Sequence, residues 1–161
     1  MKQYVFENNK LTLIVKRSPL LVRIVLFFLS FLFFLAPFLG MALSLMLGGR
    51  FHFGFLIGIV VFGLVGFYML RNSLWNTYGK EVIFFNNNNA HFEADYGWFK
   101  DAKKTINVDT IDFDIITAGY EDDNLGNLII VGVETEIISV VKIPKKQLEE
   151  LIKLLKREII F

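Results

Sequence analysis

Three side chains of types that bind zinc stand at alternate positions of one short segment. His91, Glu93 and Asp95 are each two residues apart, and alternation along a β-strand places such residues on one face. Alternate residues lie about 7 Å apart along a strand, which is too far for ligands of one zinc ion. The other histidine, His52, belongs to a distant segment. We therefore interpret the three residues as a solvated strand face and predict no metal site.

A second cluster of oxygen-bearing side chains follows closer to the C-terminus. Calcium loops combine carboxylates with a glycine, but an EF-hand loop has fixed spacing and ends in a bidentate glutamate, which this run lacks. We predict a turn between strands, and turns at the tip of a domain often carry binding residues. The residues predicted to contact a protein partner are Glu121, Asp122, Asp123 and Asn124.

The chain lacks the sequence patterns of common catalytic and cofactor sites. It has no glycine-rich phosphate loop, nucleophile elbow or paired-histidine helix motif. Its zero cysteines exclude thiolate ligands, thiol nucleophiles and disulfides. Residues 72–161 carry fifteen acidic and ten basic side chains, so this part repels nucleic acid. We predict no catalytic residues, no enzyme activity, no cofactor and no nucleic-acid partner.

Two long apolar segments dominate the first half of the chain. Residues 24–47 and 53–70 contain no charged side chain. As helices they would extend roughly 36 and 27 Å, against about 30 Å of hydrocarbon in a bilayer. We predict a transmembrane hairpin over residues 18–72, with helices at about 20–47 and 51–71. A signal peptide is the alternative for the first segment, but a polar stretch precedes it and a second span follows at once.

Basic residues flank the predicted hairpin. Residues 1–23 carry five Lys or Arg and a single Glu, and cytoplasmic flanks of membrane spans collect basic residues. We therefore predict that both termini are cytoplasmic. Aromatic residues after the second span have the spacing of an interfacial belt. The predicted membrane-interface residues are Arg17, Arg23, Arg71, Trp75 and Tyr78.

Glycines in the second apolar segment indicate close helix packing. Gly54, Gly58, Gly63 and Gly66 leave room for another helix, and Gly54 and Gly58 have the four-residue spacing of a packing motif. We expect the glycines to pack the two predicted helices against each other. A homodimer through Gly54 and Gly58 is the alternative.

The segments on both sides of the predicted hairpin have the two-residue period of strands. Residues 1–17 read as a β-hairpin about Asn8-Asn9, and because an isolated hairpin is marginal we expect it to join strands beyond the second span. Residues 77–161 predict a small β-domain with an amphipathic helix over 144–160, and residues 100–104 a polar break. The predicted fold class is an α+β membrane protein with a helical hairpin inserted in or attached to an antiparallel β-barrel or sheet.

Two short motifs resemble those of a known family. Residues 140–146, Val-Val-Lys-Ile-Pro-Lys-Lys, lead into Gln-Leu-Glu-Glu-Leu at 147–151. They are similar to the strand, Pro-Lys pair and closing helix of the membrane-anchored bacterial pleckstrin-homology-like proteins, in particular the YcxB-like group. Residues 105–111 look like that group's segment leading into a middle strand. The resemblance implies a PH-like domain at a bacterial inner membrane, and the family has no settled activity to carry over.

Together these features predict a binding module tethered to a membrane. The predicted β-domain is self-contained, and its sequence carries no catalytic constellation. We expect it to recognise a protein partner, as an immunity or regulatory protein would. The alternative is a protein that senses or handles membrane lipid, using the hairpin and the PH-like domain together.

Overall fold

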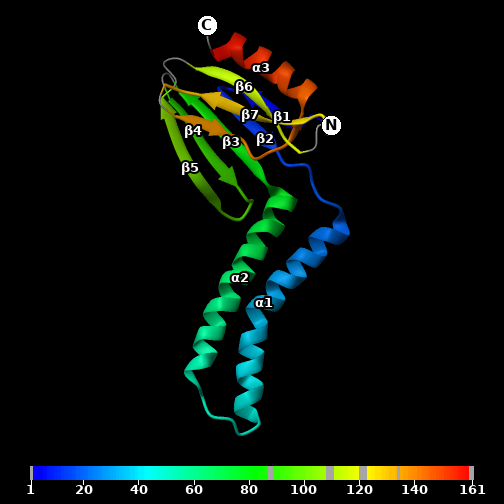
Figure 1. Cartoon of the computed structure of the whole chain (residues 1–161), viewed down its shortest axis with the longest axis vertical. Coiled ribbons are helices and arrows are strands. Elements are labelled where there is room, and N and C mark those ends of the chain that lie inside the picture. The colour runs from blue at the N-terminus through cyan, green and yellow to red at the C-terminus, as the bar shows by residue number, and fades with distance from the viewer. Residues whose placement is uncertain (1, 87–88, 108–110, 120–122, 134, 160–161) are drawn as a thin grey trace. The chain divides into compact units, whose positions relative to one another are not determined.

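The computed structural model divides the chain into two compact units. One is Arg17–Thr77, which we call the helical unit. The other combines Met1–Lys16 with Tyr78–Phe161, and we call it the β unit. Figure 1 shows the elements of each. The structure describes residues 2–86, 89–107, 111–119, 123–133 and 135–159.

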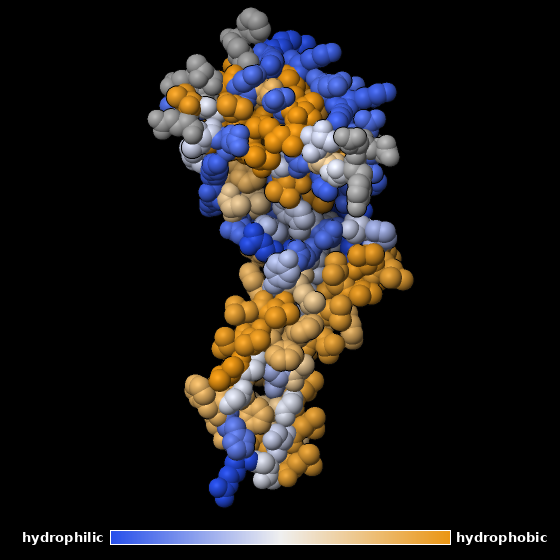
Figure 2. All heavy atoms as spheres, viewed as in Figure 1, coloured by the Kyte–Doolittle hydropathy of each residue, from blue (hydrophilic) through white to orange (hydrophobic). Residues whose placement is uncertain are grey.

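The helical unit consists of two long apolar helices. α1 spans Leu20–Met46 and α2 spans Phe53–Tyr78. The last residue of α2, Tyr78, belongs to the β unit. Both helices are long and apolar enough to cross a membrane, and only 6% of the most apolar window of each is buried. Figure 2 shows the apolar residues along both helices. Their exposed apolar surface suits a lipid environment better than water.

α2 continues past its predicted end at residue 71. Two polar side chains near its C-terminus bond to carbonyls one turn earlier: Asn76 Nδ2 donates to Asn72 O at 2.8 Å, and Thr77 Oγ1 donates to Ser73 O at 2.7 Å. These local bonds keep the polar residues within the helix. As a result, Trp75 and Tyr78 lie on α2, whereas the sequence placed them after it.

The helices approach each other closely around small residues. Ser30 and Ser73 are fully buried, with their hydroxyl oxygens 3.4 Å apart. A Cβ on Gly66 would lie 3.2 Å from Ser30 O and 3.3 Å from the Phe34 ring. The other three glycines of the predicted set face open space, so the expectation that all four pack α1 was wrong for them. The homodimer through Gly54 and Gly58 stays a prediction.

A leucine at Gly66 is expected to push the two helices apart. It meets the backbone of Ser30, which cannot move aside as a flexible side chain can, and the cost is about 1 to 3 kcal/mol. Because the chain has no cysteine, Cys replacing Phe33 and Phe62, whose rings lie 5.7 Å apart, reports the spacing by oxidative crosslinking. The yield should fall severalfold in Gly66→Leu and not in Gly58→Leu. Equal yields in the two variants would contradict this packing.

The β unit contains two antiparallel sheets. In the first, which we call sheet A, the order is β1-β2-β3-β4-β5; in the second, sheet B, β7 lies between β6 and β8 and also pairs with β9. Sheet A contains β1 (Tyr4–Glu7), β2 (Lys10–Ile14), β3 (Lys80–Asn86), β4 (Asn89–Asp95) and β5 (Lys100–Asn107). Sheet B contains β6 (Asp112–Thr117), β7 (Leu125–Val131), β8 (Glu136–Ile138) and β9 (Ile143–Pro144).

Strands that precede α1 pair directly with strands that follow α2. β1 and β2 form the hairpin expected from the sequence, with Asn8 and Asn9 at φ 51° and 58°, the backbone that its two-residue turn requires. β2 then pairs with β3 in register from Lys10↔Phe84 to Ile14↔Lys80. Sheet A is therefore built from both sides of the helical hairpin.

The core of the β unit lies between the sheets and one helix. Leu11 on β2 and Ile83 on β3 are both fully buried, and the rings of Phe85 and Phe113 join the two sheets edge to face at 6.2 Å. α3 (Lys145–Ile159) contacts β6, β7 and β9 and runs beside sheet B in Figure 1. Its amphipathic period buries Leu148, Leu151 and Leu155.

The two sheets do not close into a barrel within the described residues. At one edge, isolated bonds and not a strand ladder join β5 to sheet B: Val133 N donates to Asn107 O at 3.3 Å, and Lys104 Nζ donates to Glu136 O. At the other edge, side-chain bonds replace a strand ladder: Gln147 Oε1 accepts from Gln3 N at 3.1 Å, and Gln3 Nε2 donates to Lys142 O at 3.2 Å. The structure is α+β as predicted, and where the prediction allowed a barrel or a sheet it has two open sheets.

Residues 100–104 form the first part of β5, so the predicted polar break was wrong. Among the described strands, β5 pairs with β4 alone and forms an edge of sheet A. Charged side chains are common on edge strands because they oppose pairing with other chains. The polar run therefore reflects the position of the strand in the sheet and not its absence.

Candidate functional site

The three residues of β4 whose side chains are of types that bind zinc each contact a different group. His91 Nδ1 lies 2.8 Å from Thr105 Oγ1, Glu93 forms an ion pair with Lys100, and Asp95 Oδ1 accepts from Gly97 N at 2.8 Å. The bond to Glu93 raises the pKa of Lys100 above its ordinary value. Within the described residues, no three His, Cys, Asp or Glu side chains gather as metal ligands would.

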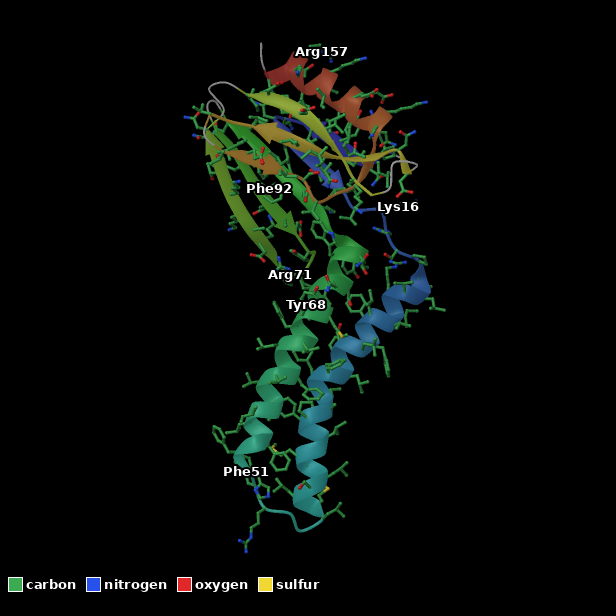
Figure 3. All side chains as sticks on the ribbon, viewed as in Figure 1. Lys16, Phe51, Tyr68, Arg71, Phe92 and Arg157 are labelled. Atoms are coloured by element: carbon green, nitrogen blue, oxygen red, sulfur yellow. The ribbon has the colours of Figure 1, made fainter. Side chains whose placement is uncertain are left out.

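The predicted interface residues lie at the ends of α1 and α2. Arg17 precedes α1 and is exposed, whereas Arg23 is half-buried in the first turn of that helix. Arg71 lies on α2 one turn after Tyr68 (Figure 3). Trp75 is half-buried and Tyr78 is exposed. The five residues thus lie just before α1, in its first turn or in the last two turns of α2, where the boundary between hydrocarbon and headgroups falls if the helices cross a bilayer.

The predicted acidic partner-binding loop connects β6 and β7 of sheet B. Glu121 and Asp122 lie outside the described residues. Asp123 Oδ2 lies 2.8 Å from where a Cβ on Gly119 would be. Asn124 has φ 52°, and its carbonyl accepts from Lys145 N at 2.9 Å. The described end of the loop is thereby fixed to the start of α3.

The outer face of sheet B exposes a group of apolar side chains. Strand pairing aligns Ile129 with Ile138, and Ile116 and Val131 alternate onto the same face. Ile138 is 45% exposed and Ile116 44% exposed, while Ile129 between them is nearly buried. Figure 2 shows an apolar patch on the β unit bordered by hydrophilic residues. We call Ile116, Ile129, Val131 and Ile138 the sheet B face.

The charges on this face are all negative. Asp112, Asp114 and Glu136 alternate with the apolar residues, and β6, β7 and β8 contain no Lys or Arg. In register, Asp114 stands opposite Ile129, and Glu136 opposite Val131. Lys156 of α3 neutralises Asp112 at 2.8 Å and lowers its pKa. Asp114 and Glu136 carry the other negative charges of the sheet B face. Lys104 of β5 donates to the backbone carbonyl of Glu136, so one basic side chain lies beside the face.

The free edge of β6 is closed to a further strand. Ala118 N donates to Leu125 O at 3.0 Å, so the even-numbered residues of β6 bond to β7 and the odd-numbered N–H groups point outward. Those of Phe113 and Ile115 are taken by the carboxylates of Asp112 and Asp114, at 2.8 and 2.7 Å. An incoming strand would have to displace both carboxylates. The face is therefore more open to a partner than this edge of sheet B.

Comparison with known proteins finds no relative for this chain. No protein-family model, curated protein or solved structure matches it. The surfaces and buried polar groups of the chain itself are therefore the basis for assigning a function.

One buried carboxyl in the β unit was missed by the sequence analysis. Glu81 on β3 is fully buried, and its Oε1 accepts from Val140 N at 2.6 Å while Oε2 has no hydrogen-bond partner. Burial raises the pKa of Glu81 to about 7, partly opposed by bonds from the N–H groups of Val140 and Val141. The alternation that buries Ile83 and Phe85 also buries Glu81, so strand period was the available signal.

The sheet B face was also missed, for a different reason. Its apolar residues come from three strands, and the sequence alone does not give the register that brings them together. The signal available was a composition: between Asp112 and Ile138 every charged residue is acidic. The acidic run at 121–124 is the densest part of that stretch, so it stood out while the isolated carboxylates on the strands did not.

Proposed function

We propose that this protein is a non-enzymatic binding module anchored in a bacterial inner membrane. α1 and α2 cross the bilayer, both termini lie in the cytoplasm, and the β unit binds a protein partner. The partner contributes a segment with apolar and basic side chains, which docks on the sheet B face. An immunity or regulatory protein is a module of this kind.

The apolar surface of the helical unit supports the membrane anchor. Side chains from Leu20 to Tyr68 are exposed on both helices, including many Phe, Leu and Val residues. In water this surface would be strongly unfavourable, at about 25 cal/mol for each Å². Basic residues stand near the start of α1 and near the end of α2, and these are the ends that connect to strands of the β unit. This arrangement favours a cytoplasmic β unit.

The sheet B face is the observation that carries the binding function. Exposed apolar residues in a group mark interaction surfaces more often than scattered ones do. Asp114 and Glu136 are interspersed among them, and Lys104 of β5 bonds to the carbonyl of Glu136. The carboxylates still outnumber this one lysine, so an acidic partner would be repelled and a basic one attracted. In sequence, the acidic run at 121–124 stands between β6 and β7 and has the same sign of charge.

The resemblance to the YcxB-like pleckstrin-homology-like proteins supports the general arrangement. The Pro-Lys-Lys motif stands at the junction of β9 and α3, where the resemblance places a strand and a closing helix. The cytoplasmic location and the absence of enzyme activity are part of the proposal.

Photo-crosslinking in native membranes tests the partner. With benzoylphenylalanine replacing Ile138, we expect a discrete protein adduct whose crosslinked peptide contains Lys or Arg beside apolar residues. Converting Asp114 and Glu136 to lysine should reduce the adduct about tenfold, because like charges then oppose each other.

Val5 is the matched control position. It is 43% exposed on β1 of sheet A and lies on a strand with no part in the sheet B face. The proposal predicts no such adduct from Val5. Adducts with lipid alone at Ile138 would instead favour a lipid-sensing role, and equal protein adducts at the two positions would refute a specific face.

A further inference from the structure

The turn between β4 and β5 holds an exposed tryptophan in a fixed position. Tyr96 N donates to Phe99 O at 3.0 Å, and the rings of these two residues stack at 4.8 Å with an interplanar angle of 15°. Gly97 has φ 87°, and its N–H bonds to Asp95 Oδ1. The turn is thus closed by backbone and ring contacts. Trp98 at its tip is 61% exposed.

This turn packs on the residue at which α2 ends. A Cβ on Gly97 would lie 2.8 Å from Tyr78 Cβ and 3.0 Å from Tyr78 Cγ, so only glycine allows the approach. Tyr78 is the last residue of α2 and is 46% exposed. Trp98 follows Gly97 directly, so its Cα lies about 3.8 Å from the Cα of the glycine that contacts Tyr78. The tryptophan is therefore held close to the C-terminal end of α2.

We propose that the β4–β5 turn is a second membrane contact, with Trp98 inserted into the interfacial layer of the bilayer. The inference rests on the proposed function in one respect, namely that α2 crosses the membrane and leaves it near Tyr78. Tryptophan is enriched at this depth because its ring is apolar and its N–H is polar. A turn fixed against Tyr78 meets the same layer.

The contact is aromatic and not electrostatic. The charged residues that flank the turn are already engaged, Asp95 with the Gly97 N–H and Lys100 with Glu93. Lys80, Asp95 and Lys100 stand in one register row beside the turn. Together with Glu93, which pairs with Lys100, their charges sum to zero. We therefore expect the contact to be the same in zwitterionic and anionic membranes, unlike a polybasic site.

Tryptophan fluorescence in the full chain tests the proposal, because Trp75 and Trp98 are the two tryptophans of the sequence. In Trp75→Phe, reconstituted in phosphatidylcholine vesicles, Trp98 should be quenched about twofold by lipid brominated near the headgroup end of the chains, and less by lipid brominated near the methyl end. Adding phosphatidylglycerol should leave the quenching unchanged. A Trp98 that bromolipid leaves unquenched and iodide quenches would overturn the proposal.

Two further variants separate this proposal from the membrane anchor. Trp98→Phe leaves Trp75 on α2 as the reporter: quenching of Trp75 without quenching of Trp98 keeps the anchor and refutes the turn contact. If neither is quenched, the anchor fails as well. A tryptophan replacing Val133, exposed in the β7–β8 connection, in a chain lacking the two native tryptophans, should stay unquenched. Quenching there equal to that of Trp98 would refute a contact specific to the turn.

Discussion

Raising the pH through the range from 4.5 to about 7 is expected to destabilise the β unit by about 3 kcal/mol through Glu81. Its pKa is about 7 in the folded chain, against an ordinary value of 4.5. Over that range the folded state holds the proton and the unfolded state releases it, so the free energy of unfolding falls as pH rises. The contribution of Glu81 is fully present below 4.5 and is lost once the pH exceeds about 7.

Glu81→Gln isolates this effect. A neutral amide keeps an acceptor for Val140 N and does not titrate, so the variant should lack this decline and should exceed the native chain in stability at about pH 8. Glu81→Leu is the second comparison, because it removes the charge but also leaves Val140 N without its acceptor. Urea unfolding of the full chain in detergent micelles, followed by Trp98 fluorescence in Trp75→Phe, measures all three. Parallel pH profiles for the native chain and the Glu81→Gln variant would contradict the assignment.

Truncating a side chain that precedes the first helix is expected to destabilise the β unit as a whole. Leu11 is fully buried and stands between Phe6 and Ile83 in the register of sheet A. Leu11→Ala removes buried apolar volume and leaves a cavity, which costs about 2 to 5 kcal/mol. The same unfolding experiment should show the loss in Trp98 fluorescence, although Trp98 lies in the β4–β5 turn and not on the N-terminal hairpin.

Val5→Ala is the matched control for this prediction. Val5 lies on the neighbouring strand of the same hairpin, and its side chain is exposed. Its truncation should change the free energy of unfolding by no more than about 0.5 kcal/mol. If Leu11→Ala were equally mild, the first strands would be an accessory to the β unit and not part of its core.

The sequence predicted the elements of this chain better than their assembly. Two apolar helices and an α+β class are confirmed, because long uncharged runs and a sustained two-residue period are strong local signals. The start of β5 was missed because an edge strand tolerates the charges that usually indicate a loop. The division into two sheets was missed because closure depends on contacts such as Gln3 with Lys142, which are far apart in sequence.

The candidate surfaces differ in whether the sequence alone could identify them. The acidic residues at 121–124 stand next to one another, so composition alone identified them. Identifying the sheet B face requires the registers of three strands. Identifying Trp98 as a membrane contact requires the packing of Gly97 on Tyr78. Glu81 was within reach, since it alternates with buried Ile83 and Phe85. Long-range register is the information that local patterns lack.

The pairing of β2 with β3 also means that sheet A cannot be completed until both helices have been synthesised. Sixty-five residues separate Ile14 from Lys80, which a ribosome adds in roughly 3 to 13 s at about 5 to 20 residues per second. Until that interval ends, the N-terminal hairpin lacks β3, the strand that pairs with β2. Any delay in inserting the two helices prolongs the time in which its open edge and its leucines are available to other nascent chains.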